Sequence, residues 1–150
     1  MKISWTNLKI SIAGARLSHL VQKDKVWDHG SIVEQVRTVF IYLKKAFIQK
    51  DPTIVKKCMT PEIYKKIRKE IESKKWKTII EAELVSVEII SVIPSKYDQP
   101  DKFKALIKLK KAGKENLIGA ISFYRSNRLS EQEWLFVREG NWWLLDEIRR

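Results

Sequence analysis

The stretch SIVEQVRTVFIYLKKAF, residues 31–47, decides the fold class because its apolar residues recur at helical spacing. One face carries Val36, Phe40, Leu43 and Phe47. Charged residues lie between these positions, so the segment predicts an amphipathic helix with one buried face that extends to Gln49. Ser31 and Glu34 have the spacing of a capping box, which predicts that the helix begins at Ser31.

Two further helix starts follow, and each is a proline preceded by a residue that can cap a helix. Asp51-Pro52 predicts a short helix over Pro52–Cys58, and Thr60-Pro61 predicts a third helix over Pro61–Lys74. In the third helix the isoleucines recur every four positions, at Ile63, Ile67 and Ile71. Its basic residues lie mostly on the opposite side, so its buried face is also defined.

After Trp76 the apolar residues change from a helical to an alternating period. Between Ile80 and Ile89 they switch parity after Leu84, which predicts a bulge in a long, bent strand. Apolar residues alternate with lysines from Phe103 to Leu109, which indicates a strand with one apolar and one lysine-rich face. Further strands are predicted over 117–124, 133–138 and 142–148, with a turn at Ala112-Gly113 and a tight hairpin at Gly140-Asn141.

Residues 1–27 are interpreted as an N-terminal extension, formed by a short strand or a helix. Alternation from Leu8 to Ile12 favours a strand, whereas the spacing from Leu17 to Val21 fits one or two helical turns. Residues 28–150 then form one domain in which helices precede an antiparallel meander. This order predicts an α+β fold with three helices on one face of an antiparallel sheet of about four strands.

The composition indicates a globular, basic protein. Hydrophobic residues make up 44% of the 150 residues, and 30 basic against 18 acidic residues give a formal net charge of +12. Such a charge favours anionic partners such as nucleic acid, phospholipid or an acidic protein. The charge is concentrated between His29 and Lys75, where twelve residues are basic and five are acidic. The candidate docking residues are Lys44, Lys45, Lys65, Lys66, Arg68, Lys69, Lys74 and Lys75.

Two sets of residues resemble a known family. The first set reads Val26-Trp27-Asp28, then Ala46-Phe47 and Asp51, then Met59-Thr60-Pro61-Glu62-Ile63-Tyr64. The second set reads Trp134-x-Phe136-x-Arg138, a short turn, and Trp142-x-x-Leu145-Asp146-Glu147-Ile148. From Val26 to Ile148 the chain thus resembles the import-motor scaffold domain. That domain is the C-terminal, membrane-facing part of the forty-four-kilodalton-class subunit of the mitochondrial inner-membrane translocase, and it has many bacterial relatives.

The resemblance implies the cone of the nuclear-transport-factor-two-like superfamily, a curved antiparallel sheet wrapped on three helices. Such a cone can hold a pocket, and the aromatic candidates to line it are Phe103, Phe123, Trp134, Phe136 and Trp142. We expect at least Trp134 and Trp142 to be buried. Two residues before the first tryptophan of the second set, the family usually has a glutamate, whereas this chain has Gln132. Any role of that glutamate in the family is therefore not expected here.

The remaining chemistry-bearing residues predict no catalytic, metal or cofactor site. His19 and His29 lack the further ligands that a metal needs. Cys58, the single cysteine, excludes an internal disulfide and is expected to be a buried apolar residue. Asp146 and Glu147 are expected to pair with Arg138 or Arg149 rather than to act as acid or base. No glycine-rich phosphate loop is present, since Gly113 and Gly119 stand alone.

These observations favour a non-enzymatic adaptor or scaffold domain that docks on an anionic membrane surface or on a membrane-bound protein complex. One alternative is association with RNA or the ribosome, because the resemblance extends to a mitochondrial large-ribosomal-subunit protein. Another is a small-molecule pocket or an enzyme of the same superfamily. The segment Met1–Leu20 fits neither a signal peptide nor a transmembrane helix, so we expect a cytoplasmic protein that can associate with membranes.

Overall fold

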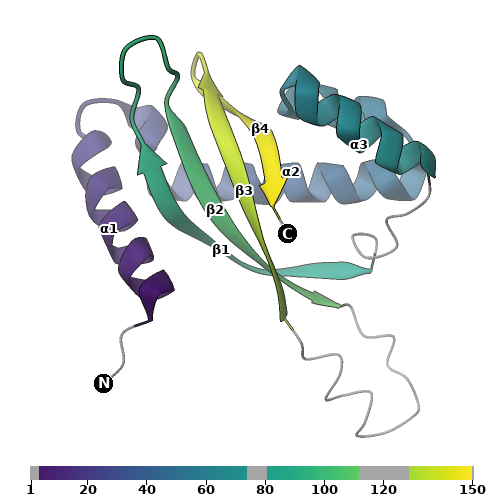
Figure 1. The fold of residues 1–150 in the computed structure, drawn as a ribbon, viewed down its shortest axis with the longest axis horizontal. Helices are drawn as coiled ribbons and strands as arrows, with labels where there is room; N and C mark the ends of the chain where they lie inside the picture. Colours follow the sequence, from purple (N-terminus) through teal and green to yellow (C-terminus); the bar gives the residue numbers. More distant parts are fainter. Residues whose placement is uncertain (1–3, 74–80, 112–128, 150) are drawn as a thin grey trace, which may run out of the picture.

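The computed structural model describes residues 4–73, 81–111 and 129–149, in which helices lie against one curved sheet (Figure 1). In chain order the elements are α1 (Trp5–Leu20), η1 (Lys25–Trp27), α2 (His29–Gln49), η2 (Pro52–Cys58), α3 (Pro61–Ser73), β1 (Ala82–Ile93), β2 (Lys102–Lys111), β3 (Leu129–Glu139) and β4 (Trp142–Arg149). The α+β class and the order of helices before strands are confirmed. The strand predicted over 117–124 and the turn at Ala112-Gly113 lie outside the described residues.

The sheet is an antiparallel meander in which the strands follow chain order, β1-β2-β3-β4. The predicted bulge is present, because the register of β1 on β2 shifts between Leu84 and Ser86. A second shift, between Ile89 and Ser91, was not predicted. Bulges bend a strand and increase its twist. Figure 1 accordingly shows the strands curving in front of α2, which runs across their back.

The three predicted helices form, but α2 begins at a different residue. Its N-terminal cap is Asp28, whose carboxylate accepts hydrogen bonds from the Ser31 N–H at 2.9 Å and the Ser31 hydroxyl at 2.8 Å. The prediction that Ser31 caps the helix is therefore wrong, since the carboxylate bonds the free N–H and also suits the positive end of the helix dipole. At η2 the prediction holds, because Asp51 accepts from the Thr53 N–H at 3.1 Å and Pro52 lies in the first turn.

Of the two forms considered for the N-terminal extension, a helix forms over Trp5–Leu20, so the strand favoured near Leu8 is wrong. Helix α1 begins after Ser4, whose hydroxyl accepts from the Asn7 N–H at 3.0 Å. Ala13 and Leu17, one helical turn apart, are buried in the same core as the sheet. This burial outweighs the short alternating pattern, which covers few residues.

Both edges of the sheet contact helical elements, which limits the strand edge that could pair with other chains. Helix α1 lies along β1 (Figure 1), and Arg16 Nη1 donates to the Val92 carbonyl oxygen at 3.3 Å. At the other edge the Thr60 N–H donates to the Leu145 carbonyl oxygen of β4 at 3.0 Å. The start of α3 is thereby attached to the sheet.

A continuous series of aromatic rings fills the space between the sheet and the helices. In order of contact the rings are Trp27, Trp143, Phe103, Phe136, Trp134 and Phe40. Ring centroids of successive members are between 4.8 and 6.4 Å apart. The series runs from η1 through β4, β2 and β3 to α2, so one set of contacts joins helices to sheet.

Trp134 is buried as predicted, but Trp142 is not. Trp142 is 52% exposed, whereas its neighbour Trp143 is 1% exposed and donates its Nε1–H to the Val26 carbonyl oxygen at 3.3 Å. The error arises because the turn at Gly140-Asn141 places Trp143, rather than Trp142, on the face that β4 shares with Leu145. Successive strand residues point to opposite faces, so an adjacent pair of tryptophans must divide between core and surface.

The two tryptophans give a matched test of this burial. We expect Trp143→Ala to lower the free energy of unfolding by about 3–5 kcal/mol, because it removes a large ring from the filled core. Trp142→Ala is expected to lower it by less than about 1 kcal/mol, as surface substitutions do. Urea denaturation of both variants measures the difference, and a larger loss for Trp142→Ala would contradict the assigned strand faces.

Candidate functional site

The aromatic residues proposed to line a pocket are mostly core. Phe103, Trp134 and Phe136 are fully buried and contact one another, with the Phe103 and Phe136 rings stacked at 4.9 Å. They therefore fill the region in which a pocket was expected. Phe123 lies outside the described residues. Trp142 borders a groove of about 570 Å³ between the β3–β4 turn and α2, on the surface rather than inside the sheet.

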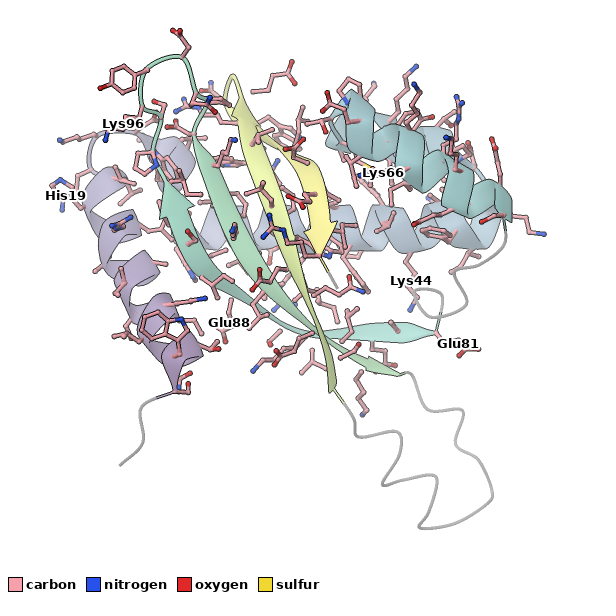
Figure 2. The ribbon with its side chains drawn as sticks, viewed as in Figure 1. His19, Lys44, Lys66, Glu81, Glu88 and Lys96 are labelled. Atoms are coloured by element: carbon pink, nitrogen blue, oxygen red, sulfur yellow. The ribbon has the colours of Figure 1, made fainter. Side chains whose placement is uncertain are left out.

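The basic candidates divide into several kinds. Exposed side chains that point into solvent from the helices belong to Lys45, Lys65, Lys66, Arg68 and Lys69. Lys44 is half-buried instead, and its Nζ donates to the Ala82 carbonyl oxygen at 2.9 Å. Figure 2 shows Lys44 extending from α2 toward the start of β1. Lys44 is thus a structural link between α2 and the sheet, while Lys74 and Lys75 lie outside the described residues.

Two exposed lysines absent from the sequence-based candidates join this surface. Lys56 and Lys57 lie in the last turn of η2, which packs against α3. The sequence analysis counted both lysines in the basic segment 29–75. The sequence did not show that η2 and α3 are adjacent, so the two lysines were not chosen as candidates. We call the exposed cations of η2 and α3 other than Lys66 the basic face: Lys56, Lys57, Lys65, Arg68 and Lys69.

A groove of about 410 Å³ lies within the basic face, between η2 and α3. Its lining residues are Lys56, Met59, Pro61, Glu62, Tyr64, Lys65 and Arg68. Met59 is buried and Tyr64 is half-buried, so the groove combines apolar surface with three cations and one carboxylate. Arg68 Nε is 3.9 Å from Glu72 Oε1, and both side chains are at least half exposed, so this ion pair is weak. We call this feature the basic groove.

The opposite flank of α3 has the reverse charge. A groove of about 300 Å³ between α3 and β4 is lined by four carboxylates, from Glu62, Glu70, Asp146 and Glu147, and by one cation, Lys66. Arg149 Nε donates to Glu147 at 3.0 Å and holds the pKa of that carboxyl below its usual range, with a smaller attraction from Lys66. Lys66 therefore faces carboxylates, unlike its neighbour Lys65.

The C-terminal carboxylates have structural partners. Glu147 pairs with Arg149, as expected. Asp146 accepts a hydrogen bond from the Thr60 hydroxyl at 2.8 Å. Arg138 binds neither of them, and its Nη1 instead contacts Asp24 at 2.7 Å and Asp101 at 2.9 Å. These contacts join the α1–η1 connection, the β1–β2 loop and β3, so they stabilise the fold.

Histidine and cysteine side chains are dispersed among the described residues. His19 points away from the sheet on α1 (Figure 2), and His29 is exposed at the start of α2. Within the described ranges, no group of three or more His, Cys, Asp or Glu side chains could hold a metal ion. Cys58 is 7% exposed, as expected of a buried apolar residue, and burial raises the pKa of its thiol.

Comparison with known proteins assigns no family. No family model matches the sequence, and no curated protein matches it. Among solved structures, the chain is similar to the solution structure of a SEC-C motif containing protein from Rhodopseudomonas palustris, with 12% identity over 70% of each chain and a TM-score of 0.34. A likeness of this size carries no functional inference, so membership of the import-motor scaffold family stays a prediction. No described helix is both long and apolar enough to cross a bilayer.

Lys44 and Lys45 provide a matched test of structural and surface roles. We expect Lys44→Met to lower the free energy of unfolding by about 1 kcal/mol, because it removes the donor to the Ala82 carbonyl oxygen. Lys45→Met should change it by less than about 0.5 kcal/mol, since Lys45 is exposed. Thermal and urea denaturation compare the two, and equal effects would show that the Lys44 contact contributes nothing to stability.

The contacts of Asp24 predict a pH dependence of stability. The Val26 N–H and then Arg138 donate to this carboxylate and hold its pKa below the ordinary value of 3.8. The resulting stabilisation is therefore present above that value and is lost as the pH falls through the lower pKa of the folded state. As the pH falls below about 4 we expect the wild type to lose more stability than Asp24→Asn. Parallel urea titrations measure this, and identical pH profiles would contradict it.

Proposed function

We propose that this chain is a non-enzymatic docking domain whose basic face binds the anionic surface of a membrane. The observation that supports this most directly is the gathering of five exposed cations on η2 and α3. Each basic residue near an anionic bilayer contributes about 1 kcal/mol, so a cluster of this size is sufficient for peripheral binding. Such binding weakens with salt, because exposed charges are screened over about 8 Å at physiological ionic strength.

The filled core supports a docking role over an enzymatic one. An enzyme of this architecture needs a cavity with a tuned acid or base inside it. Between α2 and the sheet the described side chains are packed aromatic and aliphatic residues, and no buried residue there is polar or charged. The surface, not the interior, is thus the better candidate for function.

The outward face of the sheet favours a membrane over RNA as the anionic partner. Two lysines of β2 lie opposite carboxylates of the neighbouring strands, Lys110 opposite Glu83 and Lys108 opposite Glu131. Cross-strand pairs of opposite charge neutralise one another locally. A sheet that reads single-stranded RNA presents aromatic rings and uncompensated cations instead. The charge of these two lysines is therefore partly neutralised, whereas the basic face carries five exposed cations that an extended anionic surface can reach.

Charge reversal tests the proposal. We expect the wild type to float with vesicles that contain anionic lipid and not with neutral vesicles. Lys65→Glu/Arg68→Glu/Lys69→Glu should lose most of this binding, because each reversal turns an attraction of about 1 kcal/mol into repulsion. The matched control is Lys23→Glu/Lys25→Glu/Lys96→Glu, which reverses three exposed charges elsewhere and should retain most of the binding.

The control variant also distinguishes the effect of the basic face from the effect of the net charge of the protein. Equal losses in both triple variants would show that net charge, not the basic face, governs binding. A wild type that ignores anionic vesicles but binds single-stranded RNA in a salt-dependent titration would replace the membrane with RNA as partner. Both triple variants should fold, since surface substitutions cost little and like charges at helical spacing cost a few tenths of a kcal/mol for each pair.

A further inference from the structure

We infer that the basic groove is a specific site for the phosphate monoester headgroup of a membrane lipid. This inference rests on the proposed function and goes beyond it, because diffuse attraction requires cations but no groove. Lys56 comes from η2, whereas Lys65 and Arg68 come from α3, so the three cations surround the groove from both elements. The remaining cations of the basic face, Lys57 and Lys69, are not part of its lining.

The charge of the groove suits a dianion. Three cations and the carboxylate of Glu62 leave an excess of two positive charges among the lining residues. A phosphate monoester carries about −1.5 to −2 charges near neutral pH, whereas the phosphodiester of most phospholipids carries a single negative charge. Arg68 adds a planar guanidinium, whose parallel N–H groups match two phosphate oxygens. A monoester therefore gains more from this groove than a diester does.

The apolar part of the groove suits a lipid rather than a free phosphate. Met59, Pro61 and Tyr64 line the groove beside the cations. A lipid headgroup continues into a glycerol and acyl chains, whose carbon atoms can contact such surface, while inorganic phosphate has none. A phosphate bound here would also lie away from Glu70, Asp146 and Glu147, three carboxylates on the other flank of α3 that repel anions, although Glu62 borders both grooves. The two flanks thus admit an anionic headgroup on one side only.

The first experiment compares lipids with the wild-type protein alone. Vesicles are prepared at equal surface charge, one set with a phosphatidic acid, which is a monoester, and the other with phosphatidylserine or phosphatidylglycerol. We expect binding to phosphatidic acid vesicles to be about fivefold tighter or more, because the dianion receives charge-assisted hydrogen bonds from several donors. Equal binding to all anionic vesicles would overturn the inference and leave the proposed function intact. No binding to any anionic vesicle would overturn both.

The second experiment uses variants matched in charge and in position. Lys56→Gln/Lys65→Gln removes two cations from the groove, one on η2 and one on α3. Lys57→Gln/Lys69→Gln removes two cations outside it from the same elements. Both pairs should weaken binding to phosphatidylserine vesicles to a similar degree, roughly fivefold for each charge removed. Only the groove pair should also abolish the preference for phosphatidic acid.

A conservative variant tests the role of the guanidinium and is expected to fold whatever the fate of the double variants. Arg68→Lys keeps the charge and loses the planar pair of donors, so it should retain binding to phosphatidylserine vesicles while reducing the phosphatidic acid preference. Loss of the preference in Lys57→Gln/Lys69→Gln as well as in the groove pair would overturn the inference, because the preference would then follow total charge. Competition by inorganic phosphate as effective as soluble short-chain phosphatidic acid would overturn the lipid assignment.

Discussion

The fold depends on the aromatic series that begins at Trp27 and ends at Phe40. Its members come from η1, α2, β2, β3 and β4, so elements far apart in the sequence are held by one set of ring contacts. Each ring buries a large apolar area, and offset or edge-to-face pairs add to that stabilisation. The series also determines what the interior can do. Among the described residues, close-packed rings occupy the space behind the sheet in which a pocket was expected.

The contacts that attach α3 to β4 determine the shape of the surface around α3. The Thr60 N–H and hydroxyl bond Leu145 and Asp146, which places the start of α3 beside the last strand. Helix α3 then separates two grooves of opposite charge, one against β4 and one against η2. Its buried isoleucines fix the rotation of the helix, so Lys65 and Arg68 must border the basic groove while Lys66 faces carboxylates. The packing of the apolar face of α3 thus determines which groove each of its charged residues borders.

Sequence periodicity predicted what depends on local patterns and missed what depends on tertiary contacts. The helices over 52–58 and near 61–73 and the bulge after Leu84 follow from proline placement, four-residue spacing and a parity switch, each visible in a few residues. Near Leu8 a strand was favoured over the helix that forms, because the burial of that helix depends on β1. Trp142 was wrongly expected to be buried because one residue of register decides which of two adjacent tryptophans faces the core. Among the basic residues, Lys44 was misassigned because its partner, the Ala82 carbonyl oxygen, belongs to a distant strand.

The positive charge of the chain acts in different ways on different surfaces. Lys108 and Lys110 of β2 lie opposite glutamates, and Lys44 and Arg138 are bound within the fold, so these four cations add little to the external field. The basic face keeps its charge, and the carboxylates across α3 increase the contrast. An uneven charge distribution orients a molecule as it approaches an anionic surface. For the proposed membrane docking, the geometry around α3 favours one orientation, with η2 and the flank of α3 that borders the basic groove toward the lipid.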